Sequence, residues 1–142
     1  MQIVFATLAF AAGEFADWHY IFMETIKREN HIIDAKDKVL GRLATQVAVL
    51  LRGKNKVGFA PYKDMGDFVT LKNADKLKYT GKKFDKKIYY HHTLYLGGLK
   101  KATMKEVYDK KGPEEIFRRA VMGMLTKNKL RAQQIKRLRF EK

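Results

Sequence analysis

Residues 36–56 read KDKVLGRLATQVAVLLRGKNK, and this stretch decides how the chain begins to fold. Its apolar side chains recur at three- and four-residue spacing, the stripe of an amphipathic helix. They are Leu40, Leu43, Ala44, Val47, Ala48 and Leu51. Gly53 stands where a left-handed cap would end such a helix. The stretch therefore predicts one helix with one apolar face.

Short apolar runs on either side of this helix predict β-strands. In residues 31–34 (HIID) two isoleucines stand between polar side chains, which is typical of a short buried strand, and 68–72 (FVTLK) are rich in strand-forming residues. A further short run follows at 77–80 (LKYT). The four residues 73–76 are too few for a helical crossover, so local spacing favours a hairpin or a bent strand there. Alternating strand and helix signals indicate a single α/β domain.

Two further helical segments are expected downstream. Thr103 and Glu106 have the spacing of a capping box, and the helix they begin should run to about Lys110. The pair Gly112-Pro113 then restarts a helix, with Pro in its first turn. The buried stripe of this second helix is expected to be Ile116, Phe117, Ala120, Val121 and Met124. Residues 126–142 follow as a basic tail with seven Lys or Arg and one Glu.

The charge balance indicates the class of partner. Thirty Lys and Arg against fifteen Asp and Glu give a net charge of +15 over 142 residues, which is one domain's length. Such an excess repels itself in a folded protein, so a polyanionic partner is expected: nucleic acid first, an anionic membrane surface second. Cysteine is absent, which excludes disulfides and thiolate metal sites.

Residues 1–22 differ from the rest of the chain. They contain Glu14 and Asp17 but no Lys or Arg, so they sum to −2 and the remainder to +17. Their apolar run of about twelve residues is too short to span a bilayer. It also lacks the basic start of a signal peptide. We expect an extension upstream of a working start at Met23, followed by one domain over residues 23–142; the alternative is an extra strand or helix packed on that domain.

Residues 86–98, KKIYYHHTLYLGG, raise the question of catalysis. His91 and His92 are adjacent and would point to opposite faces of a strand, so both cannot easily bind one metal ion. No metal-ligand spacing, no cysteine and no serine accompanies them. The nucleic-acid interpretation uses the same residues as phosphate-binding cations and stacking rings. Alternation places one of Tyr89 and Tyr90 inward.

Eight short blocks, in order over residues 29–140, resemble the bacterial-type large-subunit ribosomal protein conventionally numbered thirteen. They are IDA (33–35), LGRLAT (40–45), LRGK (51–54), NADK (73–76), TGKK (80–83), YYHHT (89–93), GGLKKAT (97–103) and VMGML (121–125). The resemblance implies a three-layer α/β/α domain around a small, mostly parallel four-stranded sheet, which conflicts with the hairpin favoured at 73–76. It also implies a non-enzymatic structural protein that binds 23S rRNA and joins the large subunit early in its assembly.

We therefore expect a structural constituent of the large ribosomal subunit in the cytoplasm, with 23S rRNA and neighbouring ribosomal proteins as partners. No cofactor, metal, membrane or small-molecule substrate is expected. The alternative is a general nucleic-acid-binding protein that acts off the ribosome. One basic surface should combine helix ends, the 81–101 region and the tail. Its expected rRNA-binding residues are Arg42, Arg52, Lys54, Lys56, Lys82, Lys83, Lys86, Lys87, Tyr90, His91, His92, Gly97, Gly98, Lys100, Lys127, Lys129, Arg131, Lys136, Arg137 and Arg139.

Overall fold

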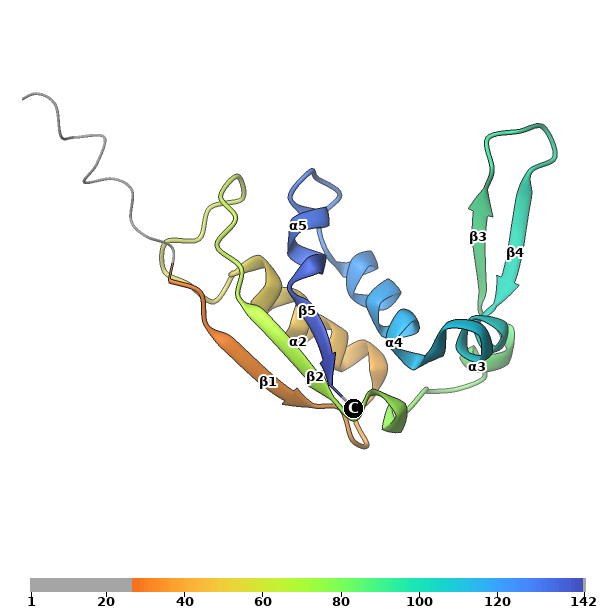
Figure 1. The fold of residues 1–142 in the computed structure, drawn as a ribbon, viewed down its shortest axis with the longest axis horizontal. Helices are drawn as coiled ribbons and strands as arrows, with labels where there is room; N and C mark the ends of the chain where they lie inside the picture. Colours follow the sequence, from red (N-terminus) through yellow and green to blue (C-terminus); the bar gives the residue numbers. More distant parts are fainter. Residues whose placement is uncertain (1–26, 142) are drawn as a thin grey trace, which may run out of the picture.

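A computed structural model describes residues 27–141 of the chain, so the expected extension 1–22 lies outside the described residues. The elements are drawn in Figure 1. In chain order they are β1 (Asn30–Asp34), α2 (Leu40–Arg52), β2 (Phe68–Lys72), the 3-10 helix η2 (Ala74–Lys76), α3 (Lys83–Lys86), β3 (Ile88–His92), β4 (Leu99–Thr103), α4 (Met104–Met124), α5 (Arg131–Lys136) and β5 (Leu138–Glu141).

Three strands form a parallel sheet in the order β1-β2-β5. Burial alternates along the central strand, where Val69 and Leu71 are fully buried and their neighbours are not. The mixed α/β class and the parallel sheet agree with the expectation. Within residues 27–141 the sheet has three strands, so the expected fourth strand is not confirmed.

Helix α2 forms as its apolar stripe predicts, and Gly53 ends it with φ 71°. A side chain at Gly53 would meet the backbone of Met65, because a hypothetical Cβ would lie 2.5 Å from its carbonyl oxygen. Glycine is therefore required there both by the left-handed backbone and by the close approach of the following loop.

The hairpin favoured at residues 73–76 is wrong. Asn73 adopts a left-handed conformation and donates from Nδ2 to Asp34 Oδ1 at 2.9 Å, and η2 follows it. Residues 77–80 do not pair back onto β2 but make a single parallel bridge, between Val39 and Lys78. A turn anchored on β1 thus leads the chain away from the sheet, which local spacing alone does not reveal.

Helix α4 contains the expected cap and the expected break. Glu106 N donates to Thr103 Oγ1 at 3.3 Å, and Gly112 leaves the helical conformation with φ 78° and ψ 175°. After the break Ile116, Phe117 and Val121 are buried. Met124 was expected in this stripe but is 41% exposed, because the buried row runs through Phe117, Val121 and Leu125 and Met124 lies beside it.

The expected basic tail is largely part of the fold. Residues 131–136 form α5, and β5 pairs in parallel with β2, from Val69–Leu138 to Lys72–Glu141. Leu138 is buried in the main core. The C-terminal segment therefore completes the sheet rather than extending from it.

The helices cover one face of the sheet, with α2 and α4 lying behind the strands in Figure 1. One core cluster combines the buried faces of α2, β2, β5 and the second half of α4. We call these elements, together with β1 and α5, the body. On the other face Ile32 is 67% exposed. A three-layer arrangement is thus not confirmed within the described residues. Over the same residues no helix is long and apolar enough to cross a membrane.

Strands β3 and β4 form a separate antiparallel hairpin that projects from the body beside the start of α4. At its base a smaller buried cluster of Met104, Val107 and Ile116 packs with Tyr89 and Ala102. The hairpin is therefore attached through α4 and not through the parallel sheet.

Candidate nucleic-acid interface

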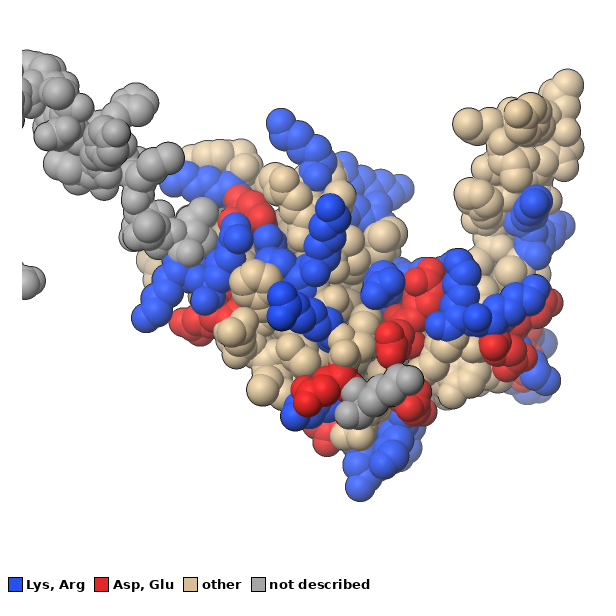
Figure 2. Space-filling model, in the orientation of Figure 1, with Lys and Arg blue, Asp and Glu red and all other residues tan. Residues whose placement is uncertain are grey.

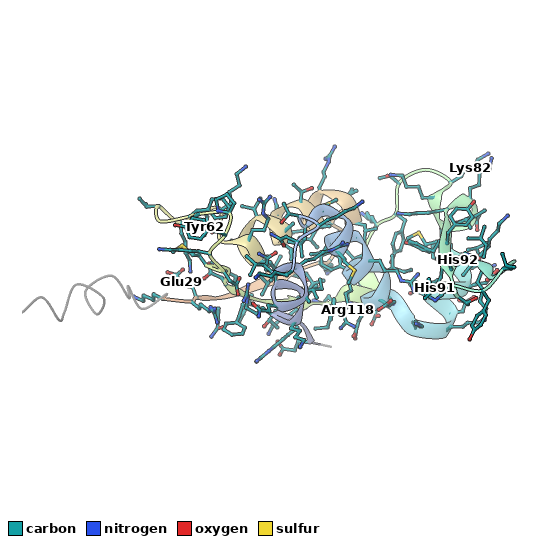
Figure 3. All side chains as sticks on the ribbon, turned by 90° about the horizontal axis from the view of Figure 1, so that it is seen from above. Glu29, Tyr62, Lys82, His91, His92 and Arg118 are labelled. Carbon is teal, nitrogen blue, oxygen red and sulfur yellow. The ribbon has the colours of Figure 1, made fainter. Side chains whose placement is uncertain are left out.

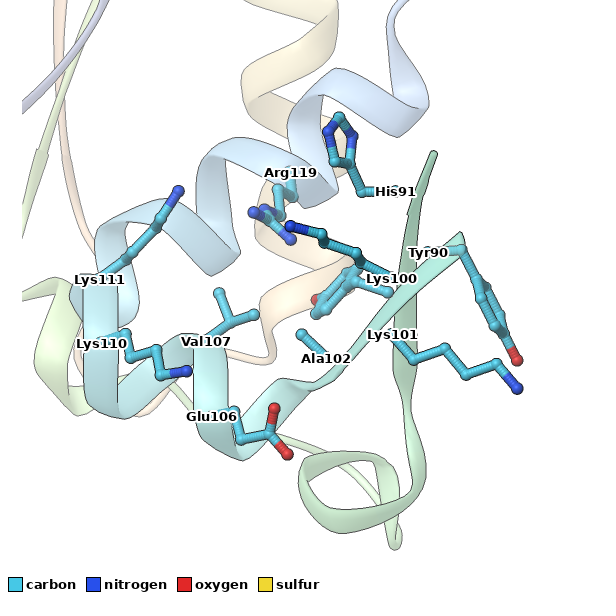
Figure 4. A pocket seen from close by; sticks show the side chains of 11 residues that line it. Tyr90, His91, Lys100, Lys101, Ala102, Glu106, Val107, Lys110, Lys111 and Arg119 are labelled. Atoms are coloured by element: carbon cyan, nitrogen blue, oxygen red, sulfur yellow. The ribbon is translucent and has the colours of Figure 1, made fainter. Parts of the chain in front are cut away.

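The β3–β4 hairpin arranges its side chains by strand alternation. Tyr89 pairs with Ala102 across the hairpin and faces the base cluster, whereas Tyr90 pairs with Lys101 and is 62% exposed. Figure 4 shows Tyr90 projecting away from α4. The expectation that one of the two tyrosines points inward is confirmed, and the inward one is Tyr89.

A groove of about 430 Å³ lies between the hairpin and the first half of α4. In Figure 4, Lys110 and Lys111 lie on the α4 side, and His91 and Lys100 on the hairpin side. The full lining is Tyr89, Tyr90, His91, Lys100, Lys101, Ala102, Glu106, Val107, Lys110, Lys111 and Arg119. Five of these eleven residues are Lys or Arg and one is Glu, so the groove is suited to an anion.

Arg119 is held in place at the groove. Its Nε donates to Glu115 Oε1 at 2.9 Å, and its guanidinium carbon lies 5.0 Å from the centre of the Tyr89 ring. Lys87 Nζ lies 5.2 Å from the same ring centre. Burial raises the pKa of Tyr89, so its hydroxyl stays neutral beside these cations. The groove thus combines a fixed guanidinium with an aromatic ring, a pairing that suits both phosphates and bases.

The two histidines have different surroundings. His91 is exposed and lines the groove. His92 Nδ1 accepts a hydrogen bond from Leu94 N at 2.9 Å and thereby supports the turn of the hairpin. Residues 27–141 contain no group of three His, Cys, Asp or Glu side chains close enough together to hold a metal ion.

The lysine-rich segment before β3 is positioned by an aromatic anchor. Phe84 on α3 packs between Tyr79 and Tyr108, with ring centres 5.7 and 5.5 Å away. Burial is the main cause that raises the pKa of Tyr79 to about 12. The four expected lysines of this segment are all exposed around that anchor: Lys82, Lys83, Lys86 and Lys87.

The expected helix-end group does not join the groove. Figure 3 shows Tyr62, in the loop after α2, at the opposite end of the molecule from Lys82, His91 and His92. Arg52 is the last residue of α2 and Lys54 follows it, both on that far side. Arg42 lies ten residues before Arg52, which corresponds to about 15 Å along the helix. The expected cations therefore do not form one compact patch.

Lys56, from the same group, holds the fold together. Its Nζ contacts the Asp67 carboxylate and donates to Lys27 O at 2.6 Å. Asp67 is fully buried and also accepts from Glu29 N at 3.0 Å, and His31 Nε2 lies 3.3 Å away. Burial by itself raises the pKa of Asp67, but these hydrogen bonds outweigh it and the pKa lies below its usual value.

Arg137 is a second expected RNA contact that the structure places inside. It is 6% exposed, makes two bonds to the Asp64 carboxylate and donates to Leu51 O at 3.2 Å. The other expected C-terminal cations remain at the surface or partly so: Lys127, Lys129, Arg131, Lys136 and Arg139. Arg139 lies over the Phe68 ring at 5.5 Å, on the open face of the sheet.

Gly97 and Gly98 serve the turn between β3 and β4. Gly97 has φ 71°, and a Cβ on Gly98 would lie 2.1 Å from Thr93 Oγ1. Both glycines are thus explained by the turn itself.

Four cations of the groove were not among the expected contacts: Lys101, Lys110, Lys111 and Arg119. Lys101 could have been found from its neighbour Lys100. The other three look like the solvated face of an amphipathic helix, and no signal in the sequence relates them to the hairpin.

The family model of ribosomal protein L13 matches residues 28–140. Large ribosomal subunit protein uL13 of Maridesulfovibrio salexigens is 54% identical over 116 residues, which cover 82% of this chain and 81% of the relative. Its namesake in Clostridioides difficile is 51% identical over 114 residues, covering 80% and 79%. That of Lachnospira eligens is 53% identical over 114 residues, covering 80% of each.

Proposed function

Because the chain belongs to the ribosomal protein L13 family, we propose that this structural constituent of the large ribosomal subunit binds 23S rRNA and supports early assembly of the subunit. Members of the family are non-enzymatic components of the cytoplasmic bacterial ribosome, so no catalytic residue is assigned. The partners are rRNA and neighbouring large-subunit proteins.

The observation that carries the rRNA-binding proposal is the groove between the hairpin and α4. Its volume of about 430 Å³ is in the range of sites that hold a nucleotide-sized group. Lys100, Lys110 and Lys111 offer charge to phosphates, while Arg119, held over the Tyr89 ring, offers a planar guanidinium. RNA recognition uses this combination of backbone charge and stacking.

The proposed interface extends from the groove along the lysines of the preceding segment. Lys82, Lys83, Lys86 and Lys87 are exposed next to the hairpin base. Arg52 and Lys54 form a second contact region at the far end, so the protein would connect two rRNA segments rather than cover one. Lys56 and Arg137 are left out, because each already neutralises a carboxylate of the body.

A salt titration tests the interface. Replacing Lys82, Lys83, Lys86 and Lys87 by Gln removes up to four phosphate contacts, so the slope of log affinity against log salt should fall by roughly 3. The measurement is binding of the full chain to 23S rRNA transcripts over a series of salt concentrations. A matched control replaces the exposed Lys36, Lys38, Lys76 and Lys105, which changes the net charge equally at other places. Equal slopes for both quadruple variants would contradict the proposed interface.

The alternative function, nucleic-acid binding off the ribosome, differs in where the native protein is found. We expect one copy per large subunit after sedimentation through a high-salt gradient. A protein that remains in the free fraction would favour the alternative.

The histidines are expected to contribute to binding and not to hydrolysis. Changing His91 and His92 to Ala should slow subunit assembly and remove no hydrolytic activity. A nuclease rate that is lost in this double variant would overturn the non-enzymatic assignment.

A further inference from the structure

The turn of the β3–β4 hairpin, residues 93–98, is the most exposed apolar part of the described chain, and we call it the tip. Leu94 is 93% exposed, Tyr95 80% and Leu96 106%. Residues 88–99 contain no Lys, Arg, Asp or Glu, although charged residues make up 32% of the chain. Figure 2 shows the far end of the hairpin free of charged side chains, while Lys and Arg are spread over the body.

The tip has a defined shape. Thr93 N donates to Gly98 O at 3.0 Å and Gly98 N donates to Tyr95 O at 2.9 Å, which closes the turn. Leu94 N donates to His92 Nδ1 at 2.9 Å. These bonds fix the backbone of the turn, and the side chains of Leu94, Tyr95 and Leu96 are exposed around it.

Leu94 is held against its own backbone preference. Its φ of 70° lies in the left-handed region, which a residue with a branched side chain rarely adopts and which glycine adopts freely. Because the Leu94 side chain is exposed, its burial does not offset this strain in the free protein. Strained residues of this kind are characteristic of binding sites, where a partner makes use of the side chain.

We propose that the tip is a protein-docking element whose Leu94, Tyr95 and Leu96 insert into an apolar pocket on a neighbouring large-subunit protein. The inference rests on the proposed function, and it assigns to the tip a different partner from that of the hairpin base. Cations at the base, from Lys82 to Lys87 and from Lys100 to Arg119, serve RNA; the uncharged tip serves protein.

Charge and shape distinguish a protein pocket from RNA as the occupant. An RNA surface presents phosphates, and the tip has no cation with which to neutralise them. Unstacked bases bind aromatic rings, so Tyr95 alone would suit RNA and the two leucines would not. The centre of a protein interface is depleted of charge and contains aromatic and aliphatic side chains, as the tip does.

Photo-crosslinking in assembled subunits tests the proposal. The full chain carries p-benzoylphenylalanine in place of Tyr95, large subunits are purified through a high-salt gradient, and they are irradiated. We expect adducts to one large-subunit protein, at an apolar segment of its surface. The matched control carries the same group in place of Tyr62, which is 78% exposed at the other end of the molecule; it should not give that adduct.

A double variant, Leu94→Gly with Leu96→Ser, identifies the side chains responsible. Glycine accepts the left-handed backbone, so the variant should fold. Its unfolding midpoint should lie no further below that of the parent than the midpoint of Val57→Ser, a control at a fully exposed residue. The adduct yield from position 95 should fall at least tenfold in the double variant and stay unchanged with Val57→Ser.

Adducts to rRNA alone, adducts to a second copy of this chain, no adduct, or an unchanged yield in the double variant would each overturn the proposal. Failure of the proposed function gives a different result. In that case the parent chain itself does not sediment with large subunits, and the salt slope of its rRNA binding is flat.

Discussion

The body and the β3–β4 hairpin are built on opposite principles. In the body, residues such as Leu51, Val69 and Phe117 are completely buried, and they come from a helix, a strand and a second helix that share one core. Along strands β3 and β4 every side chain is exposed or only partly buried. The body is stabilised by its apolar contacts, whereas the hairpin relies on backbone pairing and on its attachment to α4.

This difference indicates what each region is for. A two-stranded hairpin is marginal by itself in water, so its presence away from the core needs an anchor and a partner. The anchor is visible in Tyr89, which packs at the base beneath Arg119. The proposed partners are external, and the hairpin's exposed rings and cations are the surface that they would use. Four predictions test the contrast, beginning with the largest effect.

Phe117→Ala should destabilise the protein by about 3–5 kcal/mol, because it empties a fully buried site in the body. The removed ring also packs edge-to-face with Phe140, with centres 6.2 Å apart. Urea unfolding measures the change. Tyr95→Ala, at the tip, should change stability by no more than about 0.5 kcal/mol. Similar losses for the two variants would contradict the contrast.

Asp67→Asn should cost about 3 kcal/mol near pH 7, since it leaves the buried end of Lys56 without its carboxylate. The pKa of Asp67 is lowered in the fold, so its stabilisation is complete above the unfolded pKa of about 3.9 and is lost as the pH falls through the folded pKa. The difference between parent and variant should therefore shrink below about pH 4.

The control for this second prediction is Asp85→Asn, an exposed carboxylate on α3 near the hairpin. Its effect should stay within about 0.5 kcal/mol at both pH values. A pH-independent difference for Asp67→Asn, measured by urea unfolding at pH 7 and pH 3, would show that the carboxylate does not carry the stabilisation.

Arg119→Met should loosen the hairpin and leave the body intact. It removes the guanidinium over Tyr89 and the bond to Glu115, a local loss of about 1 kcal/mol, or roughly fivefold faster amide exchange in β3 and β4. Hydrogen exchange followed by residue measures this. Arg118→Met is the control, because Arg118 lies over Phe140 of the body at 5.6 Å. Faster exchange throughout both regions would mean that the hairpin and the body unfold together.

Leu94→Gly should have the smallest effect. Relief of the left-handed strain and the greater freedom of glycine in the unfolded chain nearly cancel, so global stability should change by less than about 0.5 kcal/mol. A clear loss in urea unfolding would show that Leu94 supports the fold itself, and that the tip is not free to serve a partner.

Sequence reasoning succeeded where the signal was local. The stripe of α2, its end at Gly53, the Thr103 cap and the break at Gly112 were all read from spacing within one segment. It was wrong for residues 73–76, where the turn depends on a hydrogen bond from Asn73 to Asp34 in another strand. It was also wrong for Met124, whose exposure depends on which side of α4 the rest of the core covers.

The candidate site divides in the same way. The exposed lysines around Phe84 and the inward turn of one tyrosine in β3 were predicted from charge and alternation. The cations of α4 were missed, because nothing local relates Lys110 or Arg119 to the hairpin across the groove.

By itself the amino-acid sequence determined the family, the strongly basic character and the main helices, since these depend on composition, short motifs and periodicity. Only the tertiary structure decided which cations are free. Arg137 is an ordinary member of a basic tail in the sequence, yet it is buried against Asp64, 73 positions away. The physical reason is that a side chain's charge belongs to the residue, whereas its burial and its partner depend on segments that packing brings together.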